Sequence, residues 1–173
     1  MRYYLQKRRN RRMEQAGKLM PYNRYKKEYS KTPRKRKPVS EKGFMELVAA
    51  LDPVFSEYIR LKYADGNGYV KCVTCGKIYF WRDIDNGHYI GRKHYAVRFD
   101  ERNCRPQCKW CNGRMEGQHF IFRQKLVDIY GGDEITKMEL FAQATKSENC
   151  DSLRYKIIEY REKVKQLKLE KGL

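Results

Sequence analysis

Four of the six cysteines form two C-x-x-C pairs, a spacing at which one tight turn presents two thiolates to the same metal ion. The pairs are Cys72/Cys75 and Cys108/Cys111, with 32 residues between them. Single pairs are also typical of redox dithiols, but two pairs in one short chain favour a metal. We therefore predict a structural Zn²⁺ held by four thiolates. Because such a site has no open coordination position, any chemistry requires a second site.

The two remaining cysteines are interpreted as small buried side chains. Cys104 lies four residues before Cys108 and could replace it as a ligand, although the 108/111 spacing fits the metal better. Nothing resembles a secretion signal, and no segment approaches the roughly 20 apolar residues needed to cross a bilayer. We expect an intracellular protein without a membrane partner, in a compartment that keeps thiols reduced.

Between the two pairs lie polar residues of the kind used to hydrolyse phosphodiesters. "DIDNGHYIGR" (83–92) contains His88, "RFDERN" (98–103) ends at Asn103, and Asn112 directly follows the last cysteine of the second pair. A neutral imidazole can activate water near neutral pH, and an amide can orient a neighbouring group. Side-chain oxygens are the ligands that Mg²⁺ prefers. A second, catalytic metal site is therefore one interpretation of this segment.

Positive charge favours nucleic acid as the partner. The formal net charge is +18, and residues 1–38 carry 15 Lys and Arg against two acids. Tyrosines are interleaved with these basic residues, a mixture that can neutralise phosphates and stack on exposed bases. A solvated tail is an equally good interpretation of this arm. The DNA-binding candidates in it are Arg8, Arg9, Arg11, Arg12, Arg34, Lys35, Arg36 and Lys37.

The hydrophobic pattern predicts mostly helices around a small sheet. We expect a helix over 41–63 with a break at Pro53, a strand over 78–85, a second strand near 96–100, and a helix after Cys108. A further helix should end at Gly131 and Gly132, with two more at about 133–144 and 151–170. The last has an apolar seam that could pack on the domain or pair with a second copy. Trp81 is expected in the core, and Trp110 is expected to pack under the zinc.

These residues in this order resemble a known family. His88, Asn103 and the run Cys108-x-x-Cys111-Asn112 resemble the HNH endonucleases, a branch of the ββα-metal (His-Me finger) nucleases. More narrowly, "DNGHYIGR", "VRFDERN" and "QCKWCN" after "CVTCGK" are similar to the NinG/Rap family of phage recombination endonucleases. The similarity covers about residues 42–130. It implies an α+β fold with a zinc-stabilised ββα-metal core, in a phage protein that acts in the host cytoplasm.

The resemblance also implies roles for individual residues. His88 would be the general base, Asn103 would hold its loop and imidazole, and Asn112 would bind a catalytic Mg²⁺ or Mn²⁺. A second ligand is usual one residue before the base, but that position is Gly87, which has no side chain. Asp85 is the nearest carboxylate and is our candidate for this ligand. Arg92, Lys93 and Arg98 flank the site and could contact phosphates, or form a solvated loop face. Asp100 and Glu101 could instead form ion pairs that pin the loop.

The predicted organisation has three parts: a basic DNA-binding arm (1–38), a helix with the zinc-bound nuclease core (39–131), and C-terminal helices (132–173). The resemblance implies cleavage of branched DNA such as Holliday junctions and D-loops, and a homodimer if two opposed strands are cut. A non-catalytic zinc module that binds nucleic acid is the first alternative. An HNH nicking, homing or restriction enzyme is the second.

Overall fold

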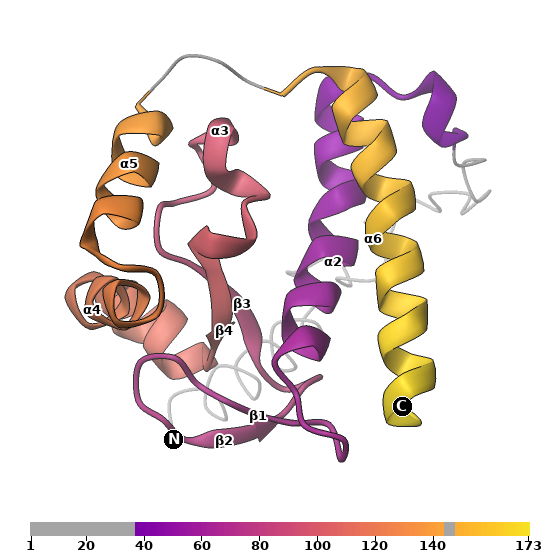
Figure 1. The fold of residues 1–173 in the computed structure, drawn as a ribbon. Coiled ribbons are helices and arrows are strands. Elements are labelled where there is room, and N and C mark those ends of the chain that lie inside the picture. The colour runs from indigo at the N-terminus through magenta and orange to yellow at the C-terminus, as the bar shows by residue number, and fades with distance from the viewer. Residues whose placement is uncertain (1–36, 144–147) are drawn as a thin grey trace, which may run out of the picture. The chain divides into compact units, whose positions relative to one another are not determined.

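The fold is taken from a computed structural model of the chain, which describes residues 37–143 and 148–173 (Figure 1). The DNA-binding candidates between Arg8 and Arg36 lie outside these residues. Residues 37–173 form one compact unit. It combines helices with two small antiparallel sheets, so the α+β expectation is confirmed at that level. The helices are η2 (Val39–Glu41), α2 (Phe44–Lys62), α3 (Tyr95–Arg98), η3 (Glu101–Asn103), η4 (Trp110–Arg114), η5 (Glu116–Gln118), α4 (His119–Tyr130), α5 (Gly132–Ala142) and α6 (Cys150–Lys171).

Helix α2 is continuous, so the predicted break at Pro53 is wrong. Proline removes one backbone N–H and disturbs the carbonyl four residues earlier. Both Pro53 and Ala49 lie on the exposed face, where water can bond that carbonyl. On the opposite face, apolar residues at helical spacing are buried: Leu47, Val48, Leu51, Phe55, Ile59 and Leu61. Burial of this face outweighs the local cost of the proline.

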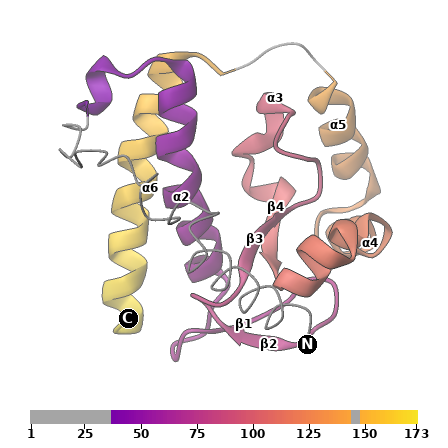
Figure 2. The ribbon, with the colours of Figure 1, turned by 180° about the vertical axis from the view of Figure 1, so that it is seen from behind.

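Helix α6 packs along α2, as Figures 1 and 2 show from opposite sides. Its apolar seam is buried at Leu153, Ile157, Tyr160 and Val164 and half-buried at Leu167. Phe55 and Tyr160 meet edge to face with ring centroids 4.9 Å apart, a favourable aromatic geometry. The seam that sequence alone left open therefore packs within the chain and is not available to a second copy.

Two short hairpins follow α2. Strands β1 (Tyr69–Lys71) and β2 (Ile78–Phe80) pair antiparallel, and the first cysteine pair lies in the turn between them. Strands β3 (Asp85–His88) and β4 (Cys104–Gln107) form the second sheet, with Asp85 opposite Gln107 and His88 opposite Cys104. The predicted strand over 78–85 is therefore two elements. It changes sheet after Trp81, which is buried as expected.

The second strand of this sheet lies later than predicted. Residues near 96–100 form the short helix α3 and a turn, although Val97 and Phe99 are buried as strand residues would be. Their burial comes from a compact loop whose carbonyls are bonded by side chains, which replace a strand partner. Asn103 consequently precedes the pairing strand instead of following it.

Helices α4 and α5 pack on the other side of the β3–β4 sheet from α2, as the two views show (Figures 1 and 2). They form a second, smaller core from Val97, Phe122, Leu126, Ile135 and Met138. Gly131 ends α4 with φ +86°, a conformation that favours glycine. The three helices predicted for the second half of the chain are confirmed. Among the described residues, every helix is too short or too polar to cross a membrane.

Candidate metal centre and neighbouring polar site

The cysteine pairs predicted to share a metal meet in space. The Sγ atoms of Cys72, Cys75, Cys108 and Cys111 all lie within 4.8 Å of one another. Those of Cys75 and Cys108 are 3.9 Å apart. Two thiolates bound to one tetrahedral Zn²⁺ with bonds of about 2.3 Å are separated by about 3.8 Å. The four residues could therefore hold a metal ion such as zinc.

Backbone amides and a hydroxyl support these sulfurs. The amide of Cys108 donates to Sγ of Cys72 at 3.3 Å, the amide of Cys111 donates to Sγ of Cys108 at 3.5 Å, and Oγ1 of Thr74 lies 3.3 Å from Sγ of Cys72. Burial raises the pKa of Cys72, but the backbone amides of Cys108, Cys75 and Thr74 and the Thr74 hydroxyl outweigh it and lower the pKa to about 6. Burial and the neighbouring thiols raise the pKa of Cys111 to about 12. A divalent cation would stabilise all four thiolates together.

The other two cysteines lie outside this cluster. Cys104 is fully buried, and burial raises the pKa of its thiol well above the ordinary value. Cys150 is half-buried at the start of α6. Trp110 does not pack under the metal as predicted: it is 59% exposed, because the short turn of η4 directs it to solvent. Arg114 lies over its ring, with the guanidinium carbon 5.6 Å from the ring centroid.

Asn112 connects the metal turn to the first residue of β3. Its backbone amide donates to the carbonyl of Cys108 at 2.8 Å, which closes the turn around the cysteine pair. Its side-chain Nδ2 donates to Oδ2 of Asp85 at 3.1 Å. Both side chains are half-buried. The structure therefore brings together the two residues predicted to share a second metal.

The glycine before His88 has a packing reason. A Cβ at Gly87 would lie 2.6 Å from Oε1 of Gln107 and 2.7 Å from its Cβ, and real Cβ atoms do not approach so closely. Gln107 is fully buried and is held by a hydrogen bond from Nε2 to the carbonyl of Gly117 at 2.7 Å. Side chains two apart on a strand share a face, so Asp85 lies on the face that residue 87 would use. Because Gln107 fills the space beside Gly87, position 87 has no room for a carboxylate, and Asp85 carries one on the same face.

His88 ends β3 with its ring fixed by a carbonyl. Nε2 lies 3.1 Å from the carbonyl oxygen of Arg98, which can only accept, so Nε2 carries the proton and Nδ1 is left as the acceptor. Burial lowers the pKa of His88 to about 4, aided by the charges of Arg92 and Arg98 and opposed by the carbonyls of Arg98 and Asn86. The imidazole is therefore neutral at physiological pH.

Asn103 spans the loop between the two strands. Its Oδ1 accepts from the amide of Ile90 at 2.7 Å, and its Nδ2 donates to the carbonyls of Ile90 and Val97 at 2.9 and 3.0 Å. The side chain is fully buried. Because it holds residue 97 directly beside the Arg98 carbonyl that bonds His88, it supports the loop on which the imidazole depends.

The structure does not bring all the predicted residues into contact. Asp85 and His88 stand at opposite ends of β3, about 10 Å apart along the strand and on alternate faces. In the described part of the chain, no hydrogen bond joins the Asp85–Asn112 pair to His88. A substrate would have to span the two groups.

The basic candidates differ in availability. Arg92 and Lys93 are exposed. Arg98 instead donates from Nε and Nη2 to the carboxylate of Asp52 at 3.0 and 2.5 Å, which ties the loop to α2. Lys37 lies 3.6 Å from Glu46 on the surface. Contact of any of these residues with phosphate stays a prediction.

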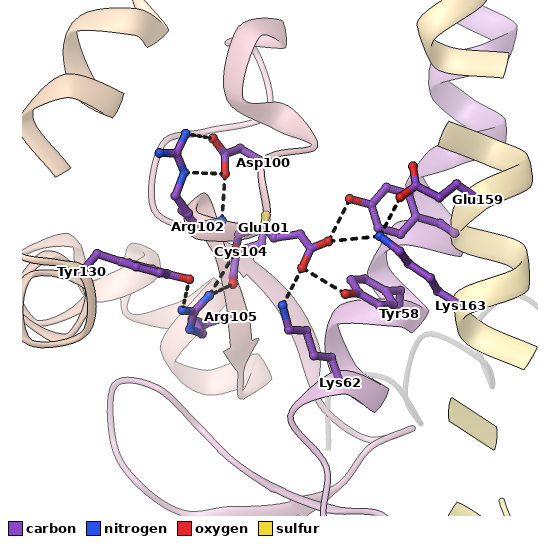
Figure 3. A network of polar contacts seen from close by, with 11 residues as sticks. Tyr58, Lys62, Asp100, Glu101, Arg102, Cys104, Arg105, Tyr130, Glu159 and Lys163 are labelled. Atoms are coloured by element: carbon purple, nitrogen blue, oxygen red, sulfur yellow. Dashed lines mark hydrogen bonds and ion pairs between the residues drawn. The ribbon is translucent and has the colours of Figure 1, made fainter. Parts of the chain in front are cut away.

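Sequence reasoning identified Glu101 only as an ion-pair candidate, but it is the centre of a polar network (Figure 3). Its carboxylate accepts from the hydroxyls of Tyr58 and Tyr160 at 3.0 and 3.1 Å and from Lys62 at 2.5 Å. Lys163 lies 3.7 Å away. Although burial raises the pKa of Glu101, these donors outweigh it and lower the pKa. Glu101 thus joins α2 and α6 to η3, which ends at Asn103.

Comparison with known proteins decides the family. The family model described as the bacteriophage lambda NinG protein matches residues 2–170. The chain belongs to the NinG family. Curated NinG proteins of Escherichia phage 933W and Enterobacteria phage VT2-Sa are each 29% identical to it over 100 residues, as is that of Salmonella phage P22.

The match covers 56% of this chain, and 48%, 48% and 47% of the three NinG relatives. The matched segment is thus about half the length of these curated relatives. No solved structure matches the chain. NinG membership supports the family resemblance found from the motifs, and the activity of the chain has to be argued from its site.

Proposed function

We propose that this NinG chain is a metal-dependent endonuclease that hydrolyses phosphodiester bonds in DNA. The observation that carries the proposal is the Asp85–Asn112 contact next to the cysteine cluster, with Asp85 on the same strand as a neutral, carbonyl-anchored His88. A module that only binds nucleic acid has no need for a neutral imidazole held by a carbonyl at Nε2, with Nδ1 left as a proton acceptor.

The Asp85–Asn112 pair has the spacing of two ligands of one small cation. Adjacent oxygen ligands of an octahedral Mg²⁺ at about 2.1 Å lie about 3.0 Å apart. Nδ2 of Asn112 and Oδ2 of Asp85 are 3.1 Å apart. Rotation of the amide by half a turn would place Oδ1 where Nδ2 lies. The pair would then offer a carboxylate and an amide oxygen to Mg²⁺ or Mn²⁺.

A bound divalent cation would supply charge stabilisation for the phosphate and the departing oxygen. The chain itself supplies the proton acceptor. Nδ1 of His88 takes a proton from the attacking water, while Nε2–H remains on the carbonyl of Arg98. Because Asn103 holds the backbone on both sides of this loop, the imidazole keeps one orientation through the reaction.

The finer proposal concerns the substrate. Residues 1–38 carry most of the net charge of +18, which favours a polyanion such as DNA. The NinG/Rap resemblance supports branched intermediates of phage recombination as the substrate, with cleavage in the host cell. A dimer is proposed only for the case in which two opposed strands are cut.

One observation favours the alternative of a zinc-stabilised binder. As placed, Asn112 and Asp85 satisfy each other by a hydrogen bond, an arrangement that a non-catalytic protein could retain. The two proposals differ in whether that pair is needed for cleavage or only for the fold.

The test is cleavage of a labelled four-way junction and a matched linear duplex, with Mg²⁺, with Mn²⁺ and with neither. The wild type is compared with Asn112→Ala and with Gln166→Ala, which changes an exposed side-chain amide on α6. We expect metal-dependent cutting, preferentially of the junction, by the wild type and by Gln166→Ala only. If Asn112→Ala cuts at the wild-type rate, the proposed ligand is wrong. If no sample cuts but all bind DNA, the binder is the better description.

A further inference from the structure

A groove of about 860 Å³ lies on the described part of the chain where the end of α2, the β1–β2 hairpin, β4 and the end of α4 meet. The proposed mechanism does not use it. Its volume falls within the range of pockets that take small aromatic ligands, roughly 300–1,000 Å³. Tyr63, Tyr69, Ile78 and Ile129 are among the aromatic and aliphatic residues that line it.

Several of these apolar side chains face solvent. Tyr69 is 51% exposed, Ile78 is 61% exposed and Ile129 is 55% exposed. Tyr69 and Ile78 stand on neighbouring strands of the small hairpin. Large apolar side chains grouped in a concave surface, unlike single ones scattered over a protein, indicate a binding surface.

A positive charge lies at the base of the groove. Arg105 is 5% exposed, and its guanidinium donates to the carbonyls of Glu101 and Cys104 and to the hydroxyl of Tyr130. It also stacks over the ring of Tyr63, 4.6 Å from the centroid. In the described part of the chain, no carboxylate lies within ion-pair distance of Arg105. Buried charges are normally paired, so this guanidinium favours an anionic ligand.

The edge of the groove also carries positive charge. Lys71 is exposed and, within the described residues, forms no ion pair. The one acid that lines the groove, Asp65, is turned to its own loop: its Oδ1 accepts from the amides of Asn67 and Tyr69 at 2.9 and 2.8 Å. The groove therefore combines aromatic and aliphatic walls with unneutralised cations.

We propose that this groove binds an unpaired nucleotide of the DNA substrate, with its base against Tyr69 and Ile78 and its phosphate near Lys71 and Arg105. Base stacking on aromatic side chains tolerates any sequence, and basic side chains follow the backbone. Arg105 lies opposite Gly87 in the β3–β4 ladder, next to His88, and paired strands are about 5 Å apart. A nucleotide held here would therefore lie against β4, the strand that pairs with the one that carries Asp85 and His88. This inference rests on the proposed function, because it takes DNA as the substrate.

The experiment compares two fluorescent duplexes of identical sequence, one with a single-nucleotide bulge of 2-aminopurine and one with that base paired. Binding is measured by anisotropy without Mg²⁺ or Mn²⁺, so that nothing is cut. The variants are Tyr69→Ala, which removes the exposed ring, and Tyr69→Phe, which keeps it. Tyr69 forms no side-chain hydrogen bond within the described residues, and thermal melting checks that each variant is folded.

We expect wild type and Tyr69→Phe to bind the bulged duplex more tightly and to quench its 2-aminopurine. Tyr69→Ala should lose about 5-fold or more of that affinity, with little change for the paired duplex. Equal affinity of wild type for the two duplexes, or an unchanged preference in Tyr69→Ala, would overturn the inference, and a protein partner would then be the better occupant. Cleavage in the four-way-junction test could still occur in either case. Failure of the wild type to bind either duplex would overturn the inference, whereas the four-way-junction test decides the proposed function.

Discussion

The side-chain amide of Asn112 donates to the carboxylate of Asp85 at 3.1 Å, and this contact joins the second cysteine pair to the start of β3. Asn112 directly follows a cysteine of the cluster, and Asp85 stands opposite Gln107, which directly precedes the other cysteine of that pair. The polar pair is thus held at both ends by elements that the cysteine cluster fixes. Its spacing should depend on whatever binds those cysteines.

The first prediction concerns the metal. Cys111→Ser should abolish stoichiometric zinc and unfold the domain, because a structural zinc contributes about 10–16 kcal/mol in small zinc modules. Cys150→Ser, which lies outside the cluster, should keep both zinc and fold. Metal analysis and thermal melting measure the effect. Equal zinc content and equal melting temperature in the two variants would rule out the four-cysteine site.

The second prediction concerns Gly87. Gly87→Ala should lower the stability by about 1–3 kcal/mol, because its Cβ would overlap Gln107 at 2.6–2.7 Å. Gly87→Asp places a carboxylate at the usual HNH ligand position. This variant should be less stable than Gly87→Ala and should not cut DNA faster than the wild type. Gln107→Gly removes the obstacle, so the cost of Gly87→Ala should shrink in that background. Denaturant unfolding of the four proteins in this double-mutant cycle measures the coupling, and additive costs would contradict the packing explanation.

The third prediction concerns the pH dependence of stability through His88. Its pKa is lowered to about 4 in the folded chain, against about 6.5 in an unfolded one. The neutral ring is favoured in the fold, so its contribution is fully present above about pH 6.5 and is lost as pH falls from there toward 4. That contribution is about 3 kcal/mol. Between pH 7 and 4, the free energy of unfolding should fall less steeply for His88→Gln than for the wild type. Identical slopes for the two proteins would contradict a neutral His88 ring in the folded chain.

The fourth prediction concerns Glu101. Glu101→Ala should cost about 2–4 kcal/mol, because it leaves Lys62 and two tyrosine hydroxyls without their acceptor. Tyr160→Phe should cost about 1 kcal/mol. The control is Glu162→Ala, which removes only an exposed pair with Lys165 and should change stability by less than about 0.5 kcal/mol. A Glu101→Ala protein as stable as the control would mean that the network contributes nothing.

Much of the fold and of the candidate site could be predicted from the sequence, because these features depend on residue spacing within short segments. The cysteine pairs, the three helices after residue 118 and the order of His88, Asn103 and Asn112 are patterns within short segments. Asp85 could be named as a candidate ligand because it is the carboxylate nearest to the usual ligand position. The sequence could not show why a glycine occupies that position, because the residue that crowds it, Gln107, lies on another strand.

The errors have the same origin. Pro53 predicts a helix break when only the local helix propensity is considered. Burial of the apolar face of α2 outweighs that propensity, and the helix continues. The segment near 96–100 has the composition of a strand, but the amide of Asn103 and the imidazole of His88 bond its carbonyls in place of a partner strand. The pairing of the Arg98 guanidinium with Asp52, which is 46 residues away in sequence, could not be predicted either, and contact of Arg98 with phosphate stays a prediction. Pairings between distant segments leave no periodic signal.

The most direct test of the central claim is single-turnover cleavage of a labelled four-way junction by wild type and His88→Ala, with DNA binding measured on the same samples. His119→Ala, which changes an exposed histidine, is the matched control. The account predicts that His88→Ala binds like the wild type but cuts at least about 100-fold more slowly, the typical contribution of a general base, while His119→Ala cuts normally. Cleavage by folded His88→Ala at the wild-type rate would contradict it.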